Sequence, residues 1–232
     1  MTTVAIIPAR GGSKRIPGKN LRLFNGVPMM AWSIRAAQRA GCFDRIVVST
    51  DDPALAELAL AEGAEVPFQR PAALADDHTG TLPVIAHALG ALPEVTLACC
   101  LYATAPLVQA HYLNEGLRLL QAHPEKSYAF SVCSFSFPVQ RALVLNEEGA
   151  LDALYPQHRY TRSQDLPAAF QDAGQFYWGR RDAWLRGDTL FSPCSLPVKL
   201  PRYLVQDIDT EEDWRRAEFM YQALKAAGEV EP

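Results

Sequence analysis

The sequence lacks the cysteine patterns of a disulfide-stabilised or zinc-binding protein. It contains five cysteines in 232 residues, an odd number, and none of them form a Cys-x-x-Cys pair. Cys99 and Cys100 are adjacent within an apolar run, which is typical of small residues in a buried strand. We therefore expect neither a disulfide framework nor a zinc site.

Long hydrophobic runs and an excess of positive charge are also absent. No apolar stretch approaches the ~20 residues needed to cross a bilayer. The chain leads from Met1 directly into an apolar run without the pattern of a signal peptide. Its formal net charge is −4, which argues against a general nucleic-acid binder. We expect a cytoplasmic protein that binds neither nucleic acid nor membrane.

Two common phosphate-binding fingerprints are missing from the glycine-rich N-terminal segment. A Walker A loop has four residues between its first glycine and Gly-Lys-Ser/Thr, whereas five residues separate Gly12 from Gly18. Asn20 stands where such a loop would carry a hydroxyl residue. The Gly-x-Gly-x-x-Gly pattern of dinucleotide-binding folds does not occur there either. A phosphotransfer NTPase built on either fingerprint is therefore disfavoured.

The same segment is nevertheless rich in groups that bind phosphate. An apolar run ends at Pro8 and is followed by glycines and a cluster of cations: Arg10, Lys14, Arg15, Lys19 and Arg22. Glycine lets a backbone approach a ligand closely, and the N–H groups of such a loop form an anion site. Arginine and lysine supply charge that matches phosphate. A local basic cluster in an acidic chain indicates a nucleoside triphosphate rather than an ordinary solvated loop.

Short apolar runs alternate with helix-like segments along the chain. We expect strands at 4–7, 45–49, 97–102 and 128–134, and helices at 28–40, 53–62, 81–92, 113–122 and 211–227. This order favours an α/β fold with a mostly parallel sheet flanked by helices. Because ligands bind beyond the carboxyl ends of strands in such sheets, residues 8–15, 50–52 and 103–106 should converge on one cleft.

Residues 136–170 interrupt this alternation. They contain Pro138, Pro156 and Pro167, scattered aromatic residues and short β-like pieces. We interpret them as a β-rich insertion within a single domain that spans residues 1–232.

The N-terminal loop, Pro8 to Arg15 followed by Gly18-Lys19-Asn20, resembles the phosphate loop of the sugar cytidylyltransferases that activate nonulosonic acids as CMP-sugars. The resemblance extends over nearly the whole chain and includes Val48 to Asp52, Ala64 to Phe68 with Arg70-Pro71, Asp76 to Thr81, Tyr102 to Pro106, Arg162 to Asp165, Asp172 to Trp178 and Asp207 to Thr210. It implies a Rossmann-like nucleotidyltransferase that joins CTP to a nine-carbon acidic sugar and releases pyrophosphate. It also implies Mg²⁺ as cofactor, and a homodimer in which residues 136–170 form the dimerisation segment and help complete the partner's site. The product would serve the glycosylation of surface glycans or flagellin.

Within that resemblance, the nucleotide is held by the loop and by three later segments. The residues concerned are Ala9, Arg10, Gly11, Gly12, Ser13, Lys19, Asn20, Arg70, Thr79, Thr81, Ala103 and Thr104. Attack at the α-phosphorus places charge on the phosphoryl oxygens and on the departing pyrophosphate, which preorganised cations offset. We expect Arg10 and Lys19 to act in this way. Capping of the following helix is an alternative role for Thr79 and Thr81, compatible with base recognition.

Asp207-Ile208-Asp209 is the expected magnesium site. Alternation in a strand would place both carboxylates on one face, and Mg²⁺ is commonly bound through one or two carboxylates together with water and phosphate. The alternative is an ordinary acidic residue at a helix start, since Thr210 is a plausible N-cap for 211–227. The phosphate loop and the resemblance favour the metal site, with Asp209 as a catalytic residue.

The acidic sugar requires a cation, and a bidentate arginine suits its carboxylate. Arg141 and Arg162 are the candidates. The other residues expected near the sugar are Gln140, Tyr160, Gln164, Gln175, Phe176 and Tyr177. Aromatic residues in this stretch fit the core of a dimer interface equally well.

Tyr102-Ala103-Thr104-Ala105-Pro106 stands where sialic acid enzymes carry Gln-Pro-Thr-Ser-Pro. The loss of that glutamine favours the pseudaminic acid branch of the family over N-acetylneuraminic or legionaminic acid. An alternative from another class is a non-catalytic, nucleotide-binding regulatory module.

Overall fold

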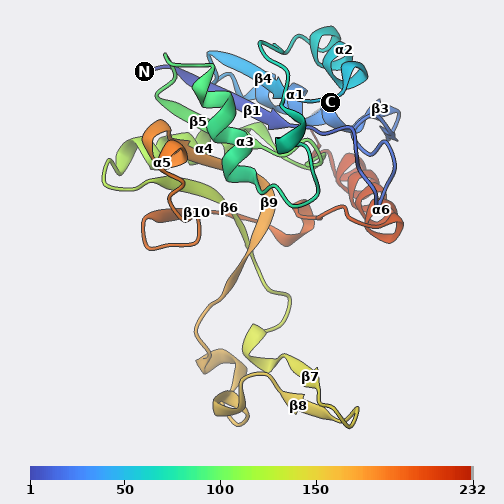
Figure 1. The fold of residues 1–232 in the computed structure, drawn as a ribbon. Helices are drawn as coiled ribbons and strands as arrows, with labels where there is room; N and C mark the ends of the chain where they lie inside the picture. Colours follow the sequence, from blue (N-terminus) through green and yellow to red (C-terminus); the bar gives the residue numbers. More distant parts are fainter. Residues whose placement is uncertain (231–232) are drawn as a thin grey trace.

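A six-stranded mixed sheet lies at the centre of the computed structural model, which describes residues 1–230 (Figure 1). The strands, in spatial order, are β10 (Ser195–Leu200), β6 (Tyr128–Ser134), β9 (Phe170–Arg180), β5 (Leu97–Leu101), β1 (Thr3–Pro8) and β4 (Arg45–Ser49). β1 pairs in parallel with β4 and β5, and β6 pairs in parallel with β10. β9 is antiparallel to both of its neighbours. The predicted α/β sheet is confirmed, whereas β9 and β10 were not predicted.

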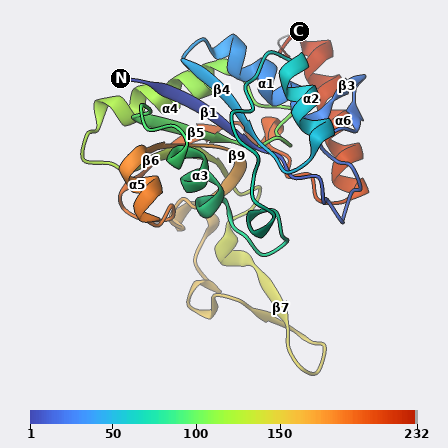
Figure 2. The same ribbon diagram turned by 45° about the horizontal axis from the view of Figure 1, so that its top comes forward.

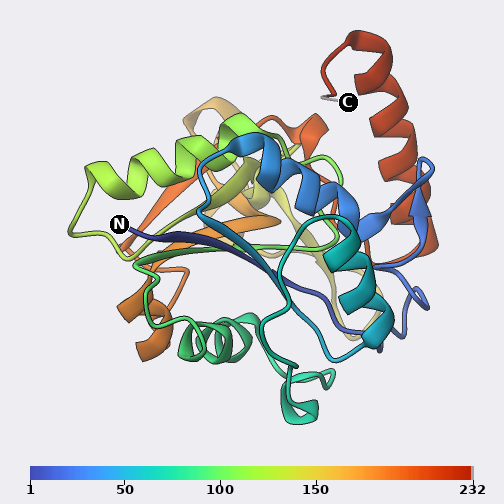
Figure 3. The ribbon, with the colours of Figure 1, turned by 90° about the horizontal axis from the view of Figure 1, so that it is seen from above.

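Helices cover both faces of this sheet (Figure 3). One face carries α1 (Met29–Ala40), α2 (Pro53–Ala61) and α4 (Ala110–Ala122). The opposite face carries α3 (Thr81–Gly90) and α5 (Arg181–Arg186). The ends of these helices follow from local chemistry. Gly41 ends α1 in the left-handed region with φ 62°, and the Asp52 carboxylate accepts the Ala54 and Leu55 N–H groups at the start of α2.

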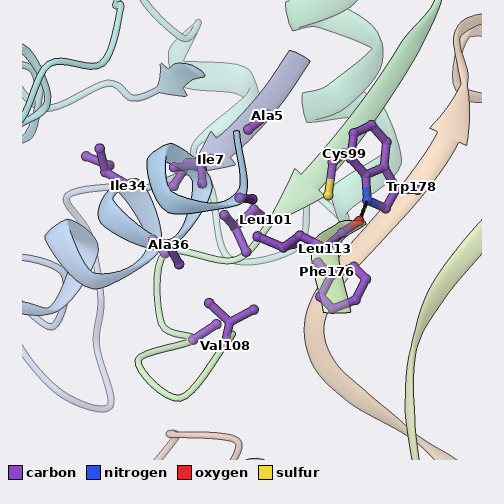
Figure 4. Close-up of a cluster of buried hydrophobic side chains, with 14 of the residues drawn as sticks. Ala5, Ile7, Ile34, Ala36, Cys99, Leu101, Val108, Leu113, Phe176 and Trp178 are labelled. Carbon is purple, nitrogen blue, oxygen red and sulfur yellow. Dashed lines mark hydrogen bonds between the residues drawn. The ribbon is translucent and has the colours of Figure 1, made fainter. Parts of the chain in front are cut away.

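The core between the sheet and α4 is dense and depends on one glycine (Figure 4). The Trp178 indole N–H donates to the Leu113 carbonyl at 2.9 Å, and the Phe43 ring stacks on Trp178 with centroids 4.9 Å apart. A Cβ at Gly116 would lie 2.6 Å from Trp178 Cδ1. Glycine therefore lets α4 approach the sheet closely enough to bury this tryptophan.

The C-terminal helix α6 (Glu211–Ala227) packs outside these layers, beside the loop that follows β1 (Figure 2). Thr210 and Asp213 form a reciprocal capping box, which confirms the predicted N-cap. Trp214 and Tyr221 pack edge-on against Phe24. Phe24 lies in β2 (Leu23–Phe24), which pairs with β3 (Val27–Pro28). No helix within residues 1–230 has the length and apolar character needed to span a membrane.

Residues 135–169, between β6 and β9, form an arm that projects from the body (Figure 1). Its strands are only β7 (Leu143–Leu145) and β8 (Leu151–Ala153), and its other regular pieces are the 3-10 helices Val139–Arg141, Pro156–His158 and Ser163–Asp165. The predicted insertion is present, but it is mostly irregular rather than β-rich. Proline at 138, 156 and 167 explains this, because it removes backbone donors that strands need.

Candidate functional site

A cavity of about 550 Å³ opens at the carboxyl ends of β1 and β5. Many of the predicted nucleotide-binding residues line it: Arg10, Ser13, Lys19, Asn20, Arg70, Thr79, Thr81, Ala103 and Thr104. Residues 8–15 and 103–106 therefore contribute to one cleft, as predicted. Residues 50–52 lie behind its wall, where the Asp51 carboxylate accepts the Gly11 N–H at 3.1 Å.

Three predicted nucleotide-binding residues do not line this cavity. Ala9 is fully buried and donates its N–H to the Ser49 carbonyl at 3.0 Å. At Gly11 a Cβ would overlap the carboxylate of Asp52, so this glycine permits a close approach to Asp52. Gly12 has open space around it and lies outside the lining. The loop thus presents side chains to the cavity, while the N–H groups of Ala9 and Gly11 hold the loop in place.

The cations of the loop meet an acidic segment across the cavity. Arg10 Nη1 donates to the Asp76 carbonyl at 2.8 Å and to Asp77 Oδ1 at 2.6 Å. Lys14 pairs with the other carboxylate oxygen of Asp77. Hydrogen bonds from Lys14 and Arg10 lower the pKa of Asp77, which therefore stays ionised. Arg10 and Lys14 are both held at the cavity wall by one carboxylate.

Two buried polar side chains complete the floor of the cavity. Arg70 is 5% exposed and donates to the Ser49 carbonyl at 2.5 Å, and burial lowers its pKa. The Asn20 amide donates to the Arg10 carbonyl at 3.1 Å. Its buried Oδ1 finds no hydrogen-bond partner among residues 1–230. An unpaired buried acceptor at a cavity wall is where a ligand donor, such as a ribose hydroxyl, would bind.

The two threonines do not cap α3. Its N-cap is Gly80, which provides no side-chain hydrogen bond. Thr79 Oγ1 donates to the Ala73 carbonyl at 3.3 Å, and Thr81 Oγ1 shares a hydrogen bond of 2.8 Å with the Tyr102 hydroxyl. The capping alternative is therefore wrong for both residues.

A second cavity, of about 590 Å³, adjoins the first, and Tyr102 lines both. It is bounded by β9, by the segment before α6 and by the first turns of α6, through residues that include Asp172, Tyr177, Asp207, Asp209, Asp213 and Arg216. Lys19 lines the first cavity and Asp209 the second, and their charged groups lie 3.7 Å apart. The two cavities therefore meet at this ion pair.

The expected strand at Asp207–Asp209 is not formed, which corrects the prediction. The segment is irregular and lies between the 3-10 helix Arg202–Leu204 and α6. Ile208 is nonetheless fully buried beside Trp214, whereas Asp207 and Asp209 on either side of it both line the cavity. This is the same alternation that a strand would have produced. Packing of Ile208, rather than strand pairing, holds the two carboxylates.

The charges around these carboxylates are closely coupled. Asp209 pairs with Arg15 at 2.7 Å, and the Lys19 ammonium donates to the Ile208 carbonyl at 2.5 Å. Burial lowers the pKa of Lys19, although Asp209 and Asp207 oppose this shift. Partial burial, followed by the Asp209 charge, raises the pKa of Asp207. Asp209 faces these cations and leaves the capping of α6 to Thr210 and Asp213, so its role as a helix-start acid is not supported.

The predicted sugar-binding residues of β9 separate according to the strand's alternation. Tyr177 lines the second cavity and donates its hydroxyl to Asp172 at 2.6 Å. Phe176 points to the other face and is fully buried in the core, which corrects the prediction. Gln175 is 2% exposed and donates to the Leu204 carbonyl at 2.5 Å, so it holds the 3-10 helix before the acidic segment instead of lining a cavity.

The predicted sugar-binding residues of the arm lie outside both cavities of their own chain. They are Gln140, Arg141, Tyr160, Arg162 and Gln164. Arg141 donates to the Thr161 carbonyl at 2.5 Å, and Arg162 pairs with Asp165 at 2.6 Å. A single chain therefore does not bring these residues to the Lys19–Asp209 junction.

Most residues of the second cavity were not predicted as site residues, and those with a hydroxyl or charged side chain are Tyr102, Asp172, Asp213 and Arg216. Tyr102 immediately precedes two predicted residues, which was the available signal. Within residues 1–230, no group of three or more histidine, cysteine or acidic residues forms a metal-binding cluster. A metal ion held by Asp207 and Asp209 would therefore have to take its other ligands from water and substrate.

Phosphate-matching cations beyond the carboxyl ends of parallel strands, next to a second, acidic cavity, define a nucleotide-binding α/β protein with room for a second substrate. Comparison with known proteins gives the family. The chain belongs to the cytidylyltransferase family, whose model matches residues 4–214.

Individual relatives agree with this family. The chain is 42% identical over 225 residues to a pseudaminic acid cytidylyltransferase of Campylobacter jejuni, covering 95% of this chain and 97% of that one. It is 34% identical over 215 residues to an N-acylneuraminate cytidylyltransferase B of Danio rerio, covering 92% and 50%. The solved structure of a CMP:2-keto-3-deoxy-manno-octonic acid synthetase complexed with CTP matches with a TM-score of 0.71 at 22% identity, covering 97% and 100%. This last likeness shows the fold alone.

Proposed function

We propose that the protein transfers CMP from CTP to pseudaminic acid, giving CMP-pseudaminic acid and pyrophosphate. The observation that carries this proposal is the pair of adjoining cavities, one lined by cations and the other by carboxylates, which meet where Lys19 approaches Asp209. A transfer between two substrates needs this arrangement, because the attacking hydroxyl and the α-phosphorus must be held side by side.

The first cavity would hold CTP. Arg10, Lys14 and Lys19 would bind the triphosphate, and Lys19 lies nearest the junction with the second cavity. The unpaired Asn20 Oδ1 would accept a ribose hydroxyl, and Arg70 would lie beside the base. These preorganised donors would stabilise the charge that develops on the phosphoryl oxygens and the leaving pyrophosphate.

Asp207 and Asp209 would hold Mg²⁺, and their chemistry fits that ion. Two carboxylates flank the buried Ile208, and burial, followed by the charge of Asp209, raises the pKa of Asp207. A divalent cation between them would relieve that repulsion. When bound, Mg²⁺ neutralises phosphate charge and makes a coordinated hydroxyl more acidic. Arg15 and Lys19 would then be free to turn from Asp209 toward the phosphates.

The second cavity would hold the sugar, with its anomeric hydroxyl at the junction. Tyr102 and Tyr177 would cover the less polar side of the ring. Tyr102 stands where sialic acid enzymes carry a glutamine, which favours pseudaminic acid over N-acetylneuraminic or legionaminic acid. The 42% identity to a pseudaminic acid cytidylyltransferase supports the same choice.

The protein would act as a cytoplasmic homodimer through its arm. Large apolar side chains are exposed on that arm: Phe137, Leu143, Leu145, Leu151 and Tyr160. So many exposed apolar side chains on one segment fit an interaction site, and a second copy of the chain would cover them. The partner's arm would then bring Arg141 or Arg162 toward the neighbouring sugar cavity.

The test is pyrophosphate release by the purified protein with CTP and Mg²⁺, with pseudaminic, N-acetylneuraminic and legionaminic acid offered separately. We expect release with pseudaminic acid and little with the others. Preference for another acid would retain the reaction and overturn the substrate. A folded sample that binds CTP but releases no pyrophosphate with any acid would be a nucleotide-binding regulatory module. CTP hydrolysis without sugar would indicate an NTPase.

A further inference from the structure

Arg216 is the one cationic residue among residues 1–230 that lines the second cavity. We propose that Arg216 binds the carboxylate of the acidic sugar, within the same subunit that holds the nucleotide. This inference rests on the proposed function, since it requires an acidic sugar in that cavity. It differs from the sequence-based expectation, which assigned the carboxylate to Arg141 or Arg162 on the arm.

The guanidinium of Arg216 is available for a ligand. It makes no hydrogen bond and no ion pair within 4.0 Å to any residue that the structure describes. Asp213, three residues earlier on the helix, is already occupied, because hydrogen bonds from Thr210 lower its pKa more than the charge of Arg216 does. The Asp213 carboxylate accepts the Thr210 N–H at 2.8 Å, the Asp209 N–H at 3.1 Å and the Thr210 hydroxyl at 2.8 Å. The capping box thus engages Asp213 and leaves Arg216 exposed at the cavity wall.

The charge of the cavity creates the need for such a cation. Four carboxylates line it, those of Asp172, Asp207, Asp209 and Asp213. An anionic sugar entering this space would be repelled unless its own carboxylate met a positive group. Arginine offers a planar pair of donors that matches a carboxylate, and the pairing also fixes the orientation of the ligand.

The position of Arg216 suits orientation as well as binding. It lies on the second turn of α6, three residues after the capping Asp213, and α6 begins directly after the Asp207–Asp209 segment. One rigid helix would therefore connect the carboxylate-binding group to the junction of the two cavities. In contrast, the arm arginines are already engaged, Arg162 with Asp165 at 2.6 Å and Arg141 with the Thr161 carbonyl.

The test compares Arg216→Gln with Arg215→Gln in the full-length protein. Arg215 is a neighbouring, exposed arginine of α6 that lies outside the second cavity, so its variant controls for the loss of one charge. Pyrophosphate release is measured with CTP and the preferred nonulosonic acid, and again with the C1 carboxamide of that sugar. We expect Arg216→Gln to raise the KM for the acid about 10- to 100-fold, the size of a lost charge-assisted hydrogen bond. The KM values for CTP and for the carboxamide should stay unchanged.

Further variants decide between this inference and its rivals. Arg216→Lys should recover part of the affinity, because it keeps the charge but not the paired donors. An Arg216→Gln enzyme with normal KM for the acid would overturn the inference, as would an equal rise for acid and carboxamide, which indicates a structural role. An acid-specific loss in Arg162→Gln alone would assign the carboxylate to the arm. If the wild type releases no pyrophosphate with any acid, the proposed function fails first and this inference with it.

Discussion

The body and the arm of this protein are stabilised in different ways. In the body, both faces of the sheet are covered by helices, and its largest side chains, such as Trp178 and Trp184, are fully buried. In the arm, the paired strand residues Leu145 and Leu151 are 71% and 68% exposed. The body therefore builds the nucleotide cavity from its own contacts, whereas the apolar surface of the arm has no cover within the described chain.

The predicted site residues are also divided between the body and the arm. The cations proposed to bind the triphosphate and the carboxylates proposed to bind Mg²⁺ come from loops and helix starts of the body. The predicted sugar-binding residues of the arm lie away from both cavities. Chemistry at the phosphorus should therefore depend on the body of one subunit, whereas association should depend on the arm.

The largest expected effect is that of Asp209→Asn at the junction of the cavities. It removes the charge that pairs with Arg15 and Lys19, and one of the two proposed magnesium ligands. We expect kcat to fall about 10²- to 10³-fold, with an unchanged circular dichroism spectrum. Asp188→Asn, at an ion pair with Arg186 that lines neither cavity, is the control. Near-normal turnover of Asp209→Asn with Mg²⁺ would remove Asp209 from the metal site.

Charge on the arm should affect association rather than folding. Leu145→Glu would place a carboxylate in the proposed dimer contact and should raise the dissociation constant of the dimer about tenfold or more. Analytical ultracentrifugation measures this. Phe219→Glu on α6, which alters a side chain that is 75% exposed on the body, should leave association unchanged. Dissociation caused by Phe219→Glu instead would move the interface to the body.

A methyl group added to the core should lower the stability of the fold without affecting association, which is the opposite of the effect expected on the arm. Gly116→Ala would press a Cβ against Trp178 and should cost about 1–3 kcal/mol of unfolding free energy. Thermal unfolding should show a lower Tm with unchanged association in the folded state. Gly90→Ala meets no atom within 4 Å of the new Cβ and serves as the matched control. Equal Tm values for the two variants would show that the α4–sheet contact is looser than described.

The smallest expected effect is at the helix cap beside the acidic segment. Thr210→Ala removes one half of the capping box and should cost about 1 kcal/mol, which lowers Tm by about 2–4 °C in a protein of this size. Thr161→Ala on the arm should change Tm by less than about 1 °C, because the Thr161 side chain makes no hydrogen bond within residues 1–230. A larger change in Tm for Thr161→Ala than for Thr210→Ala would contradict the view that stability comes from the body and not from the arm.

Local signals explain which parts of the fold could be predicted. The helix 211–227 and the strands 45–49 and 128–134 were predicted at their observed bounds, because caps, turns and apolar runs mark them. β9 was missed because it contains Gly174 and polar residues and is stabilised by antiparallel pairing with two distant strands. Such long-range pairing leaves little trace in one short window of sequence.

Local sequence signals were also insufficient for part of the site. Arg10 and Lys19 could be placed because they belong to the glycine-rich segment that follows the first strand. Phe176 could not be separated from Tyr177, since their opposite faces are known only once β9 is known to be a strand. Arg216 gave no signal of its own, because the face of α6 that meets the cavity depends on packing of Trp214 and Ile208.

A competition experiment between three nonulosonic acids tests the proposed reaction and its substrate preference together. The protein is given CTP, Mg²⁺ and equal amounts of pseudaminic, N-acetylneuraminic and legionaminic acid, and the CMP-sugars are quantified by mass spectrometry at early times. We expect CMP-pseudaminic acid as the dominant product, formed in step with pyrophosphate. Dominance of CMP-N-acetylneuraminic or CMP-legionaminic acid would contradict it.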